Sequence, residues 1–316
     1  IYEAVSPSVV SIQVTVPMTQ SYNFPFTFPG QGGSQDTPSQ NGLGSGFVWD
    51  KSGNIVTNNH VVDGATDITV VFSDGTTAKA TLVGSDVDSD LAVIKVDVAA
   101  DELQPVSLVD SSLVKVGQLA IAIGSPYGLE QTMTLGIISA LERSLPVDNS
   151  SSTSGLSYSI PDVIQTDASI NPGNSGGALL NARAELIGIN VALASNDNSA
   201  TAGSDGLGFA IPSNLAVRVA EAIVAGEQPS HGLLGVSVVA ASQDTDEDAN
   251  REGGLIAEVV PGGAAAQAGL RVGDVITAVD GVAVDSSTAV SAMIRLHAGG
   301  SDVTITYSRG GELSEV

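Results

Sequence analysis

The sequence contains no cysteine, few aromatic residues and few basic residues. Without cysteine the chain can form no disulfide, no thiolate metal site and no catalytic thiol. Only 11 Lys and Arg stand against 35 Asp and Glu, a formal net charge of −24. Because this charge repels nucleic-acid phosphates and anionic lipid, we expect no nucleic-acid partner.

Long hydrophobic runs are also missing, since no run approaches the roughly 18 apolar residues that span a bilayer. The chain begins at Ile1 rather than at Met. We therefore expect a soluble, trimmed chain whose N-terminal signal or membrane anchor, if it has one, precedes Ile1.

Short apolar or alternating runs follow one another closely along the first two thirds of the sequence and predict strands. Their spacing leaves no room for crossover helices between parallel strands, so an all-β core is expected. The predicted strands cover residues 9–16, 46–49, 54–57, 68–72, 78–84, 91–96, 118–124, 133–140, 163–165, 178–180, 186–192 and 208–211.

Two irregular segments interrupt this pattern. Residues 17–42 are rich in Gly, Pro, Ser, Gln and Asn but carry aromatic residues at alternate positions from Tyr22 to Phe28. Prolines and low-complexity flanks favour an interaction loop over a core strand. The second segment, residues 144–161, is predicted to be an irregular connection.

The first convincing helix follows Pro212, with Ser213 as its expected N-cap and Gly226 as its end. At roughly 150 residues per domain, the 316 residues allow two domains. We place one at 1–225, a linker at 226–231 and a second β-rich domain at 232–316, whose last strand we expect to be cut short by the chain end.

Ser175 lies in Gly173-Asn174-Ser175-Gly176-Gly177, a turn in which glycines allow tight backbone bending. Such a turn exposes a nucleophilic hydroxyl and fixed amide donors for an oxyanion, with Gly173 and Ser175 as the expected donors in the 173–175 loop. The pentapeptide also fits the G-x-S-x-G elbow of esterases, but an elbow requires its Asp and His downstream.

The best partners for Ser175 lie upstream instead. His60 stands at a predicted strand end entering a helical turn, where it can serve as a base. Asp90 precedes an apolar strand that would hold its carboxylate at a buried position, although spacing alone does not choose it over Asp86 or Asp88.

These residues lie in a series of colinear motifs, and through them the sequence resembles the HtrA (DegP-like) family of serine proteases. The motifs are Pro7-Ser8-Val9-Val10, Gly44-Ser45-Gly46-Phe47-Val48, Thr57-Asn58-Asn59-His60-Val61, Asp90-Leu91-Ala92-Val93-Ile94-Lys95, Ala122-Ile123-Gly124-Ser125-Pro126 and the 165–177 segment that holds Ser175.

The resemblance implies a chymotrypsin-like double β-barrel followed by a PDZ domain. It carries the family's triad onto His60 as base, Asp90 as orienting carboxylate and Ser175 as nucleophile, with Gly173, Asn174 and Ser175 forming the oxyanion hole. It further implies an ATP-independent endopeptidase that requires no cofactor or metal, forms a trimer or higher multiple and degrades unfolded proteins outside the cytoplasm. Loops near 149–157, 169–174 and 192–198 would switch between disordered and competent arrangements.

Two positions depart from related sequences. Ala184 occupies a hairpin position where the family usually has Gly. This difference bears on the geometry of the turn and on no catalytic residue. Asn174 stands where an Asp receives the new amino terminus in activated chymotrypsin-like proteases, so we expect no such ion pair with Ile1.

Fewer residues bear on substrate specificity than on the catalytic triad. Ser169, six positions before Ser175, offers no negative charge for a basic side chain. We predict cleavage after small or medium apolar residues, with Ile170 and Leu193 as pocket walls; ordinary loop packing is the equally weighted interpretation of both residues.

The second domain opens with Leu233-Leu234-Gly235-Val236, which in a PDZ domain would offer amides to a peptide carboxylate beside a strand-accepting edge. The acidic run at 244–248 lacks the glycine and glutamate of a calcium loop and is predicted to be a solvated loop. An alternative for the whole chain is a chaperone or PDZ-binding protein whose protease site is held inactive.

Overall fold

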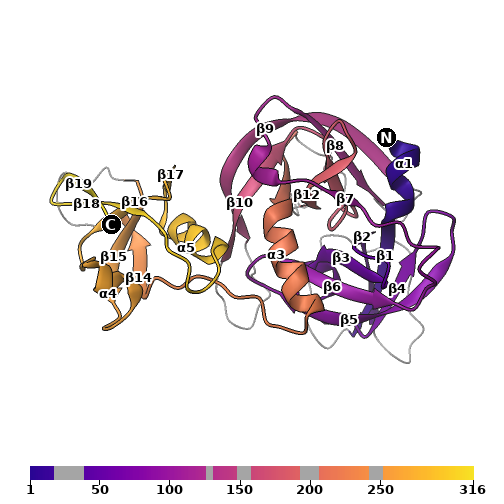
Figure 1. The fold of residues 1–316 in the computed structure, drawn as a ribbon, viewed down its shortest axis with the longest axis horizontal. Coiled ribbons are helices and arrows are strands. Elements are labelled where there is room, and N and C mark those ends of the chain that lie inside the picture. The colour runs from indigo at the N-terminus through magenta and orange to yellow at the C-terminus, as the bar shows by residue number, and fades with distance from the viewer. Residues whose placement is uncertain (18–38, 126–130, 148–157, 193–205, 242–251) are drawn as a thin grey trace. The chain divides into compact units, whose positions relative to one another are not determined.

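The computed structural model describes residues 1–17, 39–125, 131–147, 158–192, 206–241 and 252–316 (Figure 1). The aromatic positions at 22–28, the loop at 149–157, Leu193 and the acidic run at 244–248 lie outside these ranges. By its internal contacts the chain divides into two compact units, Ile1–Arg143 with Val163–Gln228 and Ser144–Asp162 with Pro229–Val316.

Six strands of the first unit form a closed barrel in the order β1-β2-β3-β6-β5-β4. Its interior is filled by a cluster that includes Val10, Ile12, Ile55, Ile94 and Val96. The strands are β1 (Val9–Pro17), β2 (Ser39–Val48), β3 (Asn54–Asn58), β4 (Asp67–Val71), β5 (Thr77–Asp86) and β6 (Leu91–Val96).

A second sheet has the order β11-β8-β9-β10-β13-β12-β7, and a further pairing of β11 with β12 closes six of its strands into a ring. A separate core cluster that includes Ile138, Ile164 and Leu179 fills it. The strands are β7 (Ser107–Leu108), β8 (Leu119–Gly124), β9 (Thr132–Val147), β10 (Tyr158–Thr166), β11 (Ala178–Leu180), β12 (Glu185–Val191) and β13 (Gly208–Pro212). The expected chymotrypsin-like double barrel is confirmed.

The described residues of this unit include three α-helices. They are α1 (Tyr2–Val5), the four-residue α2 (Asn59–Val62) after β3, and α3 (Ser213–Val224), with short 3-10 turns at Ser6–Ser8 and Ser111–Leu113. The apolar face of α3 packs on β5, β6, β12 and β13, which ties the helix to strands of both barrels. No helix among the described residues is long and apolar enough to cross a membrane.

Three local predictions were wrong. The predicted 17–42 loop is too long, because Pro17 ends β1 and β2 already begins at Ser39, where the two strands pair. The irregular 144–161 segment is partly strand, since β9 extends to Val147 and β10 starts at Tyr158. Ser213 is the first helical residue rather than the N-cap, and its hydroxyl donates to the Val109 carbonyl at 2.7 Å.

The second unit contains a five-strand sheet path, β14-β15-β16-β18-β19, with β17 beside β16. Its strands are β14 (Val236–Ala240), β15 (Gly254–Val259), β16 (Val275–Val279), β17 (Val282–Ala283), β18 (Ile305–Arg309) and β19 (Glu312–Glu315). Helix α5 (Ser287–Leu296) packs on β14, β15 and β16, and α4 (Ala264–Ala268) is a single turn. The core of this unit is a cluster of buried side chains that includes Ile256, Ile276, Val290 and Ile305.

Candidate active site

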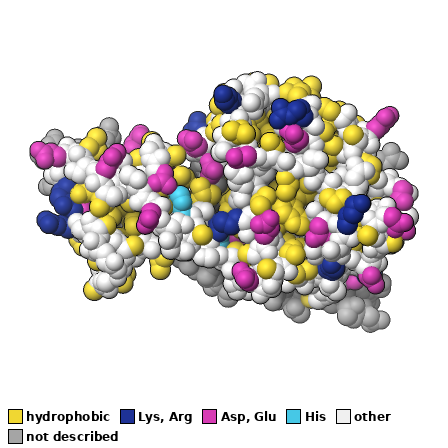
Figure 2. Space-filling model, in the orientation of Figure 1, with side chains coloured by type: hydrophobic (Ala, Val, Ile, Leu, Met, Phe, Trp, Pro, Cys, Tyr) yellow, Lys and Arg dark blue, Asp and Glu magenta, His cyan; other side chains and the backbone are white. Residues whose placement is uncertain are grey.

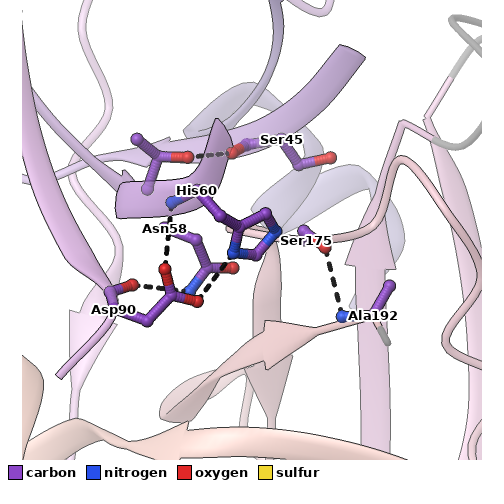
Figure 3. A network of polar contacts seen from close by, with 7 residues as sticks. Ser45, Asn58, His60, Asp90, Ser175 and Ala192 are labelled. Carbon is purple, nitrogen blue, oxygen red and sulfur yellow. Dashed lines mark hydrogen bonds and ion pairs between the residues drawn. The ribbon is translucent and has the colours of Figure 1, made fainter. Parts of the chain in front are cut away.

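His60 and Asp90 are brought together by the pairing of β3 with β6. The last residue of β3, Asn58, pairs with the first residue of β6, Leu91, so the residues just beyond these strand ends lie side by side. His60 Nδ1 lies 2.7 Å from Asp90 Oδ2, and the His60 amide donates to Asp90 Oδ1 at 2.9 Å (Figure 3). The first contact orients the imidazole, and the second holds the His60 backbone against the same carboxylate.

Asp90 is itself held in place. Its φ of 54° lies in the left-handed region that Asp tolerates better than most residues. The Asn58 amide side chain and the Asn59 backbone amide both donate to the Asp90 carbonyl at 3.0 Å. Asp90 is 1 % exposed, whereas the carboxylate of Asp86 accepts hydrogen bonds from Ser89. The structure therefore pairs Asp90, rather than Asp86, with His60.

The pKa of His60 reflects two opposed effects. Burial of the ring lowers this pKa, and the charge and hydrogen bond of Asp90 raise it. The Asp90 contributions together prevail, so the pKa of His60 lies above its ordinary value. A base with a raised pKa attracts a proton more strongly once it is deprotonated.

Ser175 lies in the loop between β10 and β11 and is 4 % exposed. The His60 ring lies between Asp90 and Ser175, with its other nitrogen on the serine side (Figure 3). The Ser175 hydroxyl accepts a hydrogen bond from the Ala192 amide at 3.1 Å. Among the described residues, His60 Nε2 has no hydrogen-bond partner.

Two backbone amides around Ser175 have no hydrogen-bond acceptor among the described residues. Gly173 has a φ of 100°, which its lack of a side chain permits. The Asn174 amide donates to Asn171 and the Gly176 amide donates to Asn190, each at 2.9 Å. Within the described ranges no hydrogen bond uses the amides of Gly173 or Ser175. Of the three predicted oxyanion-hole residues, Asn174 thus directs its amide to another acceptor.

Of the two residues predicted as walls of the substrate pocket, the structure describes only Ile170. Ile170 is 6 % exposed, belongs to the core cluster of the second barrel and packs against Gly208. Leu193 lies outside the described residues. The Ser169 carbonyl accepts a hydrogen bond from Thr134. Ile1 is 46 % exposed at the start of α1, and none of the ion pairs between described residues includes its amino group.

In the second unit, Leu233 is 86 % exposed and Leu234 is 8 % exposed, immediately before β14. Gly235 has a φ of 77°. The carbonyls of Leu234 and Gly235 accept hydrogen bonds from Ala265 and Val260. In the described part of the chain no hydrogen bond uses the amides of Leu233, Leu234 or Gly235, so this turn presents free donors.

Sequence reasoning missed three residues that contact the site. Ser45 and Asn58 appeared only inside motifs, and Ala192 appeared only where the predicted strand 186–192 meets the 192–198 loop. Asn58 supports Asp90, Ala192 contacts Ser175, and Ser45 bonds to Gly173 and Ser175. For Ser45 and Asn58, the signal was a polar side chain at a fully buried strand position. That burial depends on which strands pair, and the sequence does not show the pairing.

Comparison with protein families agrees with both units. Residues 44–189 match the family described as trypsin-like peptidase domain, and residues 232–316 match the PDZ domain.

Curated relatives cover nearly the whole chain. The chain is 38 % identical to a probable periplasmic serine protease do/HhoA-like of Haemophilus influenzae, over 99 % of this chain and 69 % of the relative. It is 39 % identical to the periplasmic pH-dependent serine endoprotease DegQ of Escherichia coli, over 99 % and 68 %. Against the serine protease PepD of Mycobacterium tuberculosis the identity is 44 %, over 86 % and 59 %.

Solved structures lead to the same family. The HtrA-type protease AlgW with decapeptide is 35 % identical, with a TM-score of 0.68 over 99 % of this chain and 95 % of that one. The serine endoprotease from Yersinia pestis gives 31 % identity and a TM-score of 0.59, over 99 % and 93 %. With a trypsin-like double barrel, a PDZ domain and these relatives, the chain belongs to the HtrA family of serine proteases.

Proposed function

We propose that Ser175 is the nucleophile of this endopeptidase, His60 its general base and Asp90 the carboxylate that orients and stabilises His60. The observation that carries this proposal is the 2.7 Å contact of His60 Nδ1 with buried Asp90, which leaves the other ring nitrogen on the side of Ser175 (Figure 3). A base fixed in this manner can take the proton of an adjacent hydroxyl.

The reaction follows from these positions. His60 Nε2 accepts the Ser175 proton as Oγ forms a bond to the scissile carbonyl carbon, and the carbonyl electron pair moves to oxygen. The free amides of Gly173 and Ser175 donate to that oxyanion. His60 then protonates the leaving amine as the peptide C–N bond breaks, and water, deprotonated by His60, releases the acyl group from Ser175.

We assign cleavage after small or medium apolar residues, with Ile170 and Leu193 as pocket walls. The absence of an acidic side chain at Ser169 supports an uncharged pocket. The substrates are unfolded or misfolded proteins, because an endopeptidase can fit an extended backbone into its site more readily than a folded one.

The PDZ unit is proposed to bind the C-terminal carboxylate of peptides through the turn from Leu233 to Val236. The free amides of this turn and the adjacent β14 support that role. By analogy with relatives named periplasmic, we propose an extracytoplasmic enzyme. We further propose that the chain forms a homotrimer or higher multiple and that it acts in protein quality control.

A second candidate function is a chaperone or peptide-binding protein whose protease site rests in an inactive arrangement. The observation in its favour is that the Ser175 hydroxyl accepts from Ala192 while His60 Nε2 lacks a partner within the described residues.

The two functions are separated by incubating the chain and its Ser175→Ala variant with reduced, unfolded casein and mapping the cuts by mass spectrometry. Parallel samples receive a peptide ending in an apolar carboxyl residue. We expect cuts after small or medium apolar residues that disappear in Ser175→Ala and increase with the peptide.

Casein kept soluble but uncut by the wild-type chain, with or without peptide, would favour the chaperone function instead. Equal cutting by wild type and Ser175→Ala would contradict the assignment of the nucleophile.

A further inference from the structure

We propose that Ser45 is a positioning residue that holds the oxyanion loop in its donor conformation. The inference rests on the proposed role of Ser175 and concerns a residue of the first barrel, on β2. Ser45 is 0 % exposed and touches neither His60 nor Asp90 through any hydrogen bond of the described chain.

The Ser45 hydroxyl makes two hydrogen bonds across the barrels. It donates to the Gly173 carbonyl at 2.6 Å and accepts from the Ser125 amide at 2.8 Å. Ser125 follows β8 of the second barrel. A single hydroxyl thus connects the first barrel, the end of β8 and the loop that carries Ser175.

The Ser45 backbone continues the connection. Its amide donates to the Ser175 carbonyl at 2.8 Å, and its carbonyl accepts from the Thr57 hydroxyl at 2.7 Å. Ser45 therefore holds the carbonyls of Gly173 and Ser175, the two residues whose amides are free. These contacts fix the peptide units that directly follow the two donors.

The hydroxyl matters most at Gly173. The Asn174 carbonyl is held by the Gly177 amide at 2.9 Å, which orients the peptide unit containing the Ser175 amide. Within the described ranges, no comparable bond holds the unit between Pro172 and Gly173. Glycine at a φ of 100° has wide conformational freedom. Two bonds restrain the peptide unit that follows this donor, one from the Ser45 hydroxyl to the Gly173 carbonyl and one from the Asn174 amide to the Asn171 carbonyl, and Ser45 supplies the one that comes from the first barrel.

The test compares Ser45→Ala with Ser213→Ala. Ser213 is also 0 % exposed, and its hydroxyl also donates to a backbone carbonyl, that of Val109 at 2.7 Å, at the start of α3. Both variants therefore lose a buried hydroxyl. Kinetics on unfolded casein give kcat and KM, reaction with diisopropyl fluorophosphate gives a second-order labelling rate, and thermal unfolding gives Tm.

For Ser45→Ala we expect kcat and the labelling rate to fall by about 10- to 100-fold with KM within about 2-fold, since a misplaced donor weakens transition-state binding alone. The pH at half-maximal kcat should stay unchanged, because the His60–Asp90 contacts are untouched. Ser213→Ala should lower Tm while keeping kcat within about 2-fold of wild type.

Equal kcat in Ser45→Ala and Ser213→Ala would overturn the role of Ser45 while leaving the proposed nucleophile intact. If Ser45→Ala does not fold, Ser45→Cys retains the shape with a weaker donor. It should give an intermediate kcat, and wild-type kcat in Ser45→Cys would overturn the proposal. A wild-type chain that neither cuts casein nor reacts with the fluorophosphate would refute the proposed function and the role of Ser45 with it.

Discussion

At the scale of single residues, the site depends on groups that are buried before any substrate binds. Asp90 is 1 % exposed, Ser175 is 4 % exposed and Asn58 is 0 % exposed. Buried polar groups are costly unless they are paired, and paired groups hold their geometry. The proposed triad is therefore preorganised at Asp90 and His60, while the Ser175 hydroxyl still bonds to Ala192.

Asp90→Asn tests the electrostatic role of the carboxylate. His60 acts as a base only when neutral, so activity should fall as the pH drops through its pKa, which Asp90 keeps above the ordinary value. The variant should lose about 10³- to 10⁴-fold in kcat, and the acidic limb of its residual activity should move to lower pH. Asp88→Asn is the control and should retain the wild-type pH profile. An unshifted acidic limb in Asp90→Asn would refute the electrostatic role of Asp90.

Gly176→Ala tests the close approach of the two barrels at the nucleophile. A Cβ at Gly176, where φ is 83°, would lie 2.2 Å from the Ser45 carbonyl oxygen and 2.4 Å from the Thr57 hydroxyl. We expect kcat to fall by about 100-fold or more, because the loop must shift. Gly117→Ala, with a similar φ of 85° and no atom within 4 Å, should lose stability without losing kcat. Similar kcat values in the two variants would contradict this explanation.

At the scale of secondary structure, the site lies where strands end. The ends of β3 and β6 position His60 and Asp90, and the loop before β11 positions Ser175. Strands supply a rigid frame, and the residues beyond their ends are free to adopt the left-handed conformations seen at Asp90 and Gly173. Ala184, in the hairpin between β11 and β12, adopts such a conformation with no role at the site.

Ala184→Gly should stabilise the protein. Ala184 has a φ of 63°, which costs a non-glycine residue about 1–2 kcal/mol, and glycine's larger unfolded-state entropy offsets part of the gain. We expect a net gain of about 0.5–1 kcal/mol in the free energy of unfolding, seen as a rise of about 1–4 °C in Tm. Ala182→Gly in the same hairpin should lower Tm, and a lower Tm in Ala184→Gly would show that the turn is not strained.

Much of the element pattern could be predicted from local sequence. The predicted strands at Leu91–Val96 and Ala178–Leu180 agree residue for residue, because each is a short apolar run with clear flanks. Asp90 could not be chosen over Asp86 and Asp88 by spacing, since the choice depends on the pairing of Asn58 with Leu91. Ser45 could not be assigned a role either, because its partners lie 80 and 128 positions away. The family resemblance supplied the triad, and the pairing of distant strands explains it.

At the scale of the whole molecule, negative charge dominates the surface. The sequence has 11 basic and 35 acidic side chains, which gives a net charge of −24. On the face drawn in Figure 2, acidic side chains are scattered rather than gathered into one patch. A spread of like charge repels itself and destabilises the compact state.

The stability of the chain should therefore rise with ionic strength. Raising NaCl from 0.1 to 1 M shortens the screening length from about 10 Å to about 3 Å. At pH 7.5 we expect Tm to increase by about 2–4 °C, equivalent to about 1 kcal/mol. Near pH 4.5, close to the sequence pI of about 4.1, the same salt step should have a smaller effect. A Tm that falls with salt at pH 7.5 would contradict self-repulsion.

Covalent labelling gives the sharpest test of the proposal that Ser175 is the activated nucleophile. The full chain is treated with diisopropyl fluorophosphate, digested and mapped by mass spectrometry, beside a His60→Ala variant. We expect one phosphoryl adduct, located on Ser175, and labelling that is slower by at least about 100-fold without His60. An adduct on another serine, or labelling of Ser175 at the same rate in both chains, would contradict the proposal.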